Sequence, residues 1–154
     1  MIDASNLILP ATTLAINCYD SMFRSCKSLT TAPELPATTL VDDCYSAMFA
    51  YCESLKTAPE LPAAKIPERS YSSMFAGCTS LVNAPELPIT SLDTYSCSGM
   101  FYGCTSLITA PELPATDLGT ACYNMMFCGC TSLTTAPSRL YSYSFPERCF
   151  QSMF

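Results

Sequence analysis

Cysteine is the most reactive side chain in this 154-residue chain, and most of its eleven copies fall into two columns with a regular spacing. The columns hold Cys26, Cys52, Cys78, Cys104 and Cys130 in one, and Cys18, Cys44, Cys122 and Cys149 in the other. A zinc site needs four ligands, but the chain has no histidine and no Cys-x-x-Cys pair. Parallel stacked cysteines fit the disulfide dihedral poorly. We therefore expect columns of buried structural thiols, with disulfides or zinc as the alternatives.

A column of carboxylates has the same spacing as the cysteines. Its members are Glu34, Glu60, Glu86 and Glu112, and Ser138 takes the fifth place. Like charges about 5 Å apart repel by about 0.8 kcal/mol even in water, so the column needs some compensation. We expect turn N–H groups or solvent to provide it. A column of Ca²⁺ sites and a basic partner surface are the alternatives.

The residue types favour neither catalysis nor nucleic-acid binding. Without histidine there is no Ser-His or Cys-His pair, and the five glycines form no phosphate-binding loop. We expect a protein that is not an enzyme and has no cofactor. A net charge of −6 argues against a nucleic-acid partner, and no apolar run approaches the roughly 18 residues of a membrane span.

The chain is built from one repeated unit of 26 residues. Met-Phe pairs recur at this step from Met22-Phe23 to Met126-Phe127, and the last pair, Met153-Phe154, follows after 27. A fixed period in this range is typical of stacked repeats. We expect a single repeat domain over residues 1–154, with partial units at both ends and a one-residue insertion in the last.

Each unit predicts a short helix followed by a short strand. Cys44, Met48 and Cys52 lie at positions i, i+4 and i+8, which is helical spacing over about two turns. The segment from Leu55 to Ala58 suits a parallel strand, and Pro62 then turns the chain. The fold class predicted is an α/β solenoid: a leucine-rich-repeat-like right-handed coil of about six units, with short parallel strands on one side and short helices on the other.

Columns that never change should hold the coil together, and columns that vary should face a partner. The unvarying serines, expected to bond turn backbone, are Ser28, Ser54, Ser80, Ser106 and Ser132. The variable strand-side positions, our candidates for partner binding, are Thr30, Lys56, Val82, Ile108 and Thr134, with Tyr51 and Tyr102 at the rim.

The segment CYSAMFAYCESLKTAPELP, residues 44–62, and its copies resemble the 26-residue repeats of bacterial surface proteins, which are related to the BspA-like leucine-rich repeats. The resemblance implies a bacterial cell-surface or secreted array that binds protein partners, as adhesins do. As an alternative, uncapped ends would let the chain assemble end to end into a filament as a structural subunit.

Overall fold

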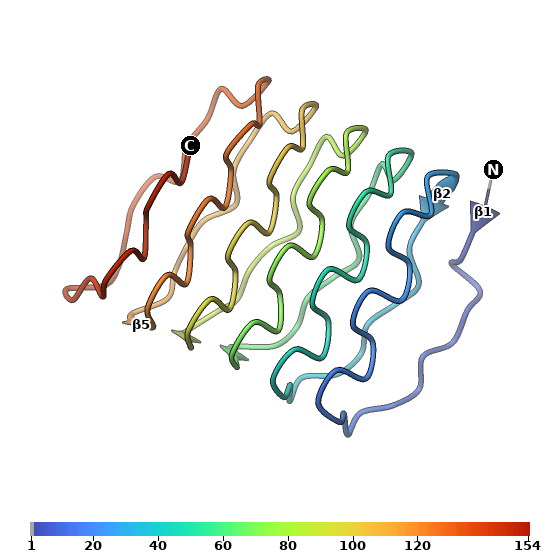
Figure 1. Ribbon diagram of the computed structural model, residues 1–154, viewed down its shortest axis with the longest axis horizontal. Helices are drawn as coiled ribbons and strands as arrows, with labels where there is room; N and C mark the ends of the chain where they lie inside the picture. Colours follow the sequence, from blue (N-terminus) through green and yellow to red (C-terminus); the bar gives the residue numbers. More distant parts are fainter. Residues whose placement is uncertain (1) are drawn as a thin grey trace.

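The computed structural model describes residues 2–154, and its repeat units lie side by side in a stack (Figure 1). We call each unit, as it lies in the stack, a rung. Consecutive rungs run parallel and 26 residues out of step, as the bridges from Thr31 to Thr57 and from Thr57 to Asn83 show. Each side chain therefore lies beside the residue that occupies the same place in the next unit.

Two small parallel sheets join neighbouring rungs, one along each of the two opposite long edges of the stack (Figure 1). One sheet pairs β1 (Ile2–Asp3) with β2 (Leu29–Thr31). The other has the order β3 (Lys65–Ile66), β4 (Ser91–Leu92) and β5 (Asp117–Leu118). Apart from these short strands, isolated bridges and turns carry the hydrogen bonds between rungs.

The predicted α/β solenoid with helices on one side is wrong. Residues 2–154 contain no helix, and the stretches predicted to be helical are runs of turns, such as residues 42–51. The strands β3 to β5 lie where Pro62 and its equivalents were expected only to turn the chain. The architecture is one of short parallel strands and turns.

The runs of turns have a regular internal pattern, which we call the turn ladder. Its segments are residues 16–25, 42–51, 68–77, 94–103, 120–129 and 147–152. Along 42–51, every second N–H bonds three residues back, as from Met48 to the Tyr45 oxygen at 3.2 Å. The intervening N–H groups bond forward to the next rung, as from Ala47 to Ser72 at 2.8 Å. Turn and sheet hydrogen bonds thus alternate along one segment.

Every fourth residue of the turn ladder has left-handed backbone geometry. Asp43, Ala47 and Tyr51 have φ values of 55°, 49° and 61°, and the equivalent residues of other rungs agree. A positive φ at the third position is what a type II turn requires. A turn that repeats every four residues places Cys44 and Met48 on the same side, so its apolar spacing imitates that of a helix.

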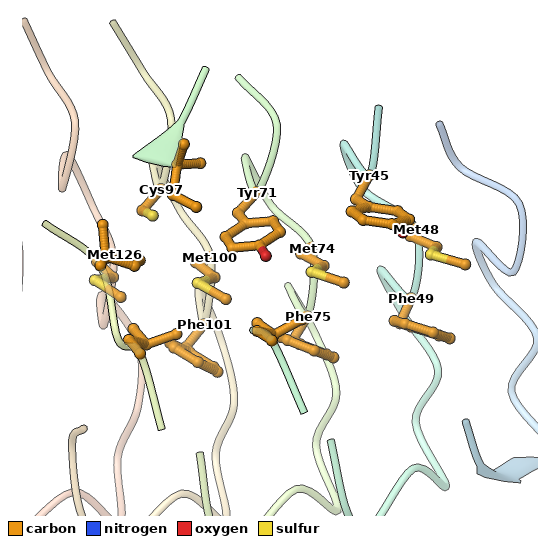
Figure 2. Packing of buried hydrophobic residues seen from close by; sticks show 14 of the residues in the cluster. Tyr45, Met48, Phe49, Tyr71, Met74, Phe75, Cys97, Met100, Phe101 and Met126 are labelled. Atoms are coloured by element: carbon orange, nitrogen blue, oxygen red, sulfur yellow. The ribbon is translucent and has the colours of Figure 1, made fainter. Parts of the chain in front are cut away.

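Aromatic columns fill the core between the two sides of the rungs (Figure 2). In one column, successive phenylalanine rings stack with centroids 5.4–5.7 Å apart and planes within 19° of parallel. Its members are Phe23, Phe49, Phe75, Phe101, Phe127 and Phe154. A second column of mostly tyrosine rings is interrupted at Cys97, which lies between Tyr71 and Tyr123 in repeat order. The buried hydroxyl of Tyr123 has no hydrogen-bond partner within residues 2–154, which costs stability.

Candidate functional site

Three open grooves with nearly the same lining lie between neighbouring Ala-Pro-Glu-Leu-Pro segments. One, of about 510 Å³, lies between residues 57–62 and 83–88, and the next, of about 490 Å³, between 83–88 and 109–112. The third, of about 400 Å³, lies between 32–36 and 59–62. Alanine, proline, glutamate and leucine line each groove, so the repeat offers one kind of surface three times.

The grooves open where the backbones of neighbouring rungs are not joined. Rungs pair at Thr57 with Asn83, and again at Lys65 with Ser91. Between these points, proline contributes no N–H, so continuous pairing is interrupted. Within the described residues, the N–H groups of Glu60 and Glu86 donate no hydrogen bond either. Two residues that line the grooves therefore have backbone donors without a partner among residues 2–154.

The groove carboxylates are exposed and, except for one, have no compensating partner. Glu34, Glu60 and Glu86 form no hydrogen bond or ion pair with any other residue of the range 2–154. Glu112 instead accepts hydrogen bonds from the Ser138 N–H at 3.0 Å and the Ser138 hydroxyl at 2.9 Å. The expected compensation by turn N–H groups thus occurs in one rung, where the column changes from glutamate to serine.

The glutamate column does not gather into a metal site. No group of three or more histidine, cysteine, aspartate or glutamate side chains in the described part of the chain could hold a metal ion. The ion pairs of the structure lie elsewhere, for example between Lys27 and Glu53 at 2.8 Å. The negative charge of the grooves is therefore balanced neither by a protein cation nor by an evident cation cage.

The predicted partner-binding positions lie beside the grooves rather than in them. Lys56, Val82, Ile108 and Thr134 are exposed, and Thr30 is half-buried. They form one column, because the Ile108 N–H bonds the Val82 oxygen at 3.2 Å and the Thr134 N–H bonds the Ile108 oxygen at 2.9 Å. Each residue directly precedes a bridge residue such as Thr57, which lines a groove.

Tyr51 and Tyr102 do not join that column. Both lie on the turn ladder with exposed fractions of 42% and 45%. The Tyr51 ring lies 5.1 Å from the Arg24 guanidinium carbon and covers Gly77 in the next rung. Reasoning from variable positions alone missed the grooves, because their lining hardly varies. The available signal was the pair of prolines in every Ala-Pro-Glu-Leu-Pro segment.

The cysteines of the first column donate hydrogen bonds across the rungs. The thiols of Cys52, Cys78, Cys104 and Cys130 lie 3.0–3.2 Å from phenylalanine carbonyl oxygens of the preceding rung. All eleven cysteines are free thiols. Burial raises the pKa of Cys78 to about 12, with a smaller contribution from neighbouring Cys52. A thiol that stays protonated at neutral pH is a poor nucleophile and a poor metal ligand.

Two members of the serine column bond the preceding rung through their backbone and not through their hydroxyls. The Ser54 and Ser80 N–H groups bond carbonyl oxygens of the preceding rung, each at 3.2 Å. None of the hydroxyls in this column forms a hydrogen bond within residues 2–154. The column consists of Ser28, Ser54, Ser80, Ser106 and Ser132.

Comparison with known proteins yields no relative. No family model, no curated protein and no solved structure matches the chain. The resemblance to bacterial surface repeats therefore stays a prediction. None of the described segments forms a helix long and apolar enough to cross a membrane.

Proposed function

We propose that this chain is a non-enzymatic repeat protein that binds protein partners through the three grooves, as an adhesin-type array of a bacterial cell surface or secreted protein does. The grooves are the observation that carries the proposal: they recur in successive rungs with the same lining. The cell-surface or secreted location rests on the resemblance of the repeats and on nothing else in the chain.

An extended, positively charged segment of a partner protein suits the grooves best. The free N–H groups of Glu60 and Glu86 can bond the carbonyl oxygens of an extended backbone. The uncompensated carboxylates of the same two residues attract lysine or arginine side chains. Apolar contacts with Pro59 and Pro85 add buried surface without adding charge.

The proposal can be tested with a set of synthetic peptides of about ten residues that differ in net charge. We expect lysine-containing extended peptides to bind and glutamate-containing ones of the same length to bind far more weakly, because the carboxylates repel them. In the Glu60→Gln/Glu86→Gln variant, affinity for the lysine peptide should fall roughly fivefold, since exposed ion pairs contribute about 0.2–1 kcal/mol each. Fluorescence anisotropy at two salt concentrations measures both effects.

Glu147→Gln provides the matched control. Glu147 is exposed like the groove carboxylates, but it is the first residue of the last turn-ladder segment and already pairs with Arg148 at 3.3 Å. Its replacement should leave peptide affinity unchanged. Because Glu147→Gln removes one charge and the groove variant removes two, a free-energy loss in the control of half that in the groove variant, or more, would mean that only the net charge matters, and the groove proposal would be wrong.

A further inference from the structure

The interval that follows the three grooves in the series, between residues 109–114 and 135–141, has a different second wall. Its first wall is an Ala-Pro-Glu-Leu-Pro segment, but its second reads Ala-Pro-Ser-Arg-Leu-Tyr from residue 136. Serine takes the place of the glutamate, Arg139 is the one-residue insertion, and Tyr141 takes the place of the second proline. Two features of the grooves, a second carboxylate and a second residue without an N–H, are thus both lost in this wall.

Backbone pairing reaches further into this fourth interval than into the grooves. Along one groove, the neighbouring rungs pair at Thr57 and then not until Lys65, eight residues later. In the fourth interval they pair at Thr109 and again at Leu113, four residues later, through a parallel bridge to Leu140. Leu140 lies 27 rather than 26 positions after its partner, so the insertion sets the register of this contact.

The second wall also covers residues whose equivalents in the grooves are more open. Ala110 is buried, with an exposed fraction of 5%, and its N–H bonds the Thr135 oxygen at 2.9 Å. The equivalent Ala84 is half-buried. Pro114 is half-buried as well, whereas the equivalent Pro88 is exposed. The chain itself therefore fills much of the space that remains open in the grooves.

The carboxylate of Glu112 is occupied by this second wall. The Ser138 N–H lies 3.0 Å from Oε1 and 3.3 Å from Oε2 of Glu112, and the Ser138 hydroxyl donates to Oε2 at 2.9 Å. Hydrogen bonds to an ionised acceptor are stronger than those between neutral groups. A partner lysine would have to compete with Ser138 for this carboxylate, whereas no side chain of residues 2–154 pairs with that of Glu86.

We propose that residues 138–141 form a latch that closes the fourth interval against the partner of the three grooves, and that a negative charge at residue 138 opens it. A carboxylate there restores the like-charge repulsion of the glutamate column and removes the hydroxyl donor that holds Glu112. The latch is an autoinhibitory contact that limits how far along the stack a partner can bind. This inference rests on the proposed function, because it concerns the same kind of surface.

Three variants separate charge at residue 138 from other effects. Ser138→Glu supplies the residue that four other units carry at this place, so the fold accommodates it. Ser138→Ala removes the hydroxyl but keeps the N–H and adds no charge. Thr105→Glu adds the same charge at an exposed position outside the grooves, which Glu53 occupies in another unit.

Amide hydrogen exchange, followed by nuclear magnetic resonance without any peptide, tests the latch contact by itself. Relative to the intrinsic rate of each sequence, protection of the residue 138 amide should fall at least fivefold in Ser138→Glu. It should stay within about twofold in Ser138→Ala and Thr105→Glu. Unchanged protection in Ser138→Glu would overturn the proposal, and so would an equal loss in Ser138→Ala, because charge would then not control the latch.

Peptide binding tests whether the latch closes a binding surface. In the Glu60→Gln/Glu86→Gln chain, adding Ser138→Glu should raise the affinity for the lysine peptide at least threefold, because Glu112 and the new carboxylate then lie free on neighbouring rungs. Adding Ser138→Ala or Thr105→Glu should not. An equal gain with Thr105→Glu, or no gain despite faster exchange at residue 138, would overturn the inference.

The two measurements also distinguish failure of the latch from failure of the proposed function. If the unchanged chain does not bind the lysine peptide, the proposed function is wrong, and closure against a partner falls with it, whatever the exchange data show. If the unchanged chain binds the peptide but exchange at residue 138 does not respond to charge, the grooves stand and the latch alone is wrong.

Discussion

Replacing Phe75 with alanine is expected to lower the free energy of unfolding by about 3–5 kcal/mol. Phe75 is fully buried and stacks on Phe49 and Phe101 with centroids 5.7 Å from each. The substitution removes the transfer free energy of the ring, leaves a cavity between two rigid neighbours and breaks two aromatic contacts. Since domains are usually stable by about 5–15 kcal/mol, the loss is a large share of the total. Urea unfolding followed by circular dichroism measures it.

Phe154→Ala is the matched control for that experiment. Phe154 belongs to the same column, but its exposed fraction is 63% and it has one ring neighbour, Phe127, at 5.6 Å. At low protein concentration we expect its replacement to cost less than about 1.5 kcal/mol. Equal losses for the two variants would contradict the view that stacking between rungs holds the core together.

Alkaline pH is expected to destabilise the protein progressively above about pH 9. Burial raises the pKa of Cys78 from the ordinary 9.0 to about 12, and it raises the pKa values of Cys97 and Cys104 in the same direction. Below pH 9 these thiols are protonated in both states, so their contribution to stability is fully present. Above pH 9 the unfolded chain releases their protons while the folded chain retains them, which favours unfolding.

The size of the alkaline effect follows from the number of buried thiols. Each such thiol lowers the free energy of unfolding by about 1.4 kcal/mol per pH unit between its unfolded and folded pKa values. Cys78, Cys97 and Cys104 together thus remove roughly 4 kcal/mol per pH unit. Urea midpoints at pH 7, 8, 9 and 10 with a reducing agent measure the slope. A midpoint that is the same at pH 7 and pH 10 would contradict the burial of these thiols.

Two cysteine variants test whether the buried thiols cause this pH dependence of the free energy of unfolding. Cys78→Ala removes a buried thiol and should reduce the pH dependence above pH 9 by about 1.4 kcal/mol per pH unit, although it also lowers stability at pH 7. Cys18→Ala removes an exposed thiol. It leaves all the buried thiols in place and so serves as the control for the substitution itself.

The 26-residue period of the sequence correctly predicted that equivalent residues pair between rungs, but the local conformation predicted within each unit was wrong. Residues 26 apart, such as Thr57 and Asn83, pair between rungs. The helix prediction failed because the turn ladder repeats every four residues, and Cys44, Met48 and Cys52 satisfy both patterns. A real helix rotates such positions by about 40° every four residues, so a strict four-residue spacing argued against it.

Glycine gave a second signal against the helix. Gly77, Gly103 and Gly129 occupy one position of the repeat, with φ values of 71°, 69° and 78°. Glycine costs about 1 kcal/mol relative to alanine inside a helix, so its recurrence in one place indicates a left-handed residue there. Tyr51 adopts the same geometry without this advantage, at φ 61°, so one unit alone would not have revealed the pattern.

The grooves were predictable only in part. Pro59 and Pro62 indicate a break in backbone pairing between rungs, because neither contributes an N–H. The free carboxylates of Glu60 and Glu86 were recognised as a column with an electrostatic cost. Their lack of a partner depends on the distance between rungs, however, and no feature of a single unit reports that distance.

The turn ladder defines the fold, and nuclear magnetic resonance can detect its backbone geometry in solution. Scalar couplings and amide contacts would be measured in the isotopically labelled chain at low concentration. We predict positive φ at Ala47, Ser73 and Met125, which have values of 49°, 54° and 54°, and close contacts between the amide of Phe49 and Met74 of the next rung. Negative φ at all three residues, with the i to i+3 contacts of a helix and none between rungs, would contradict it.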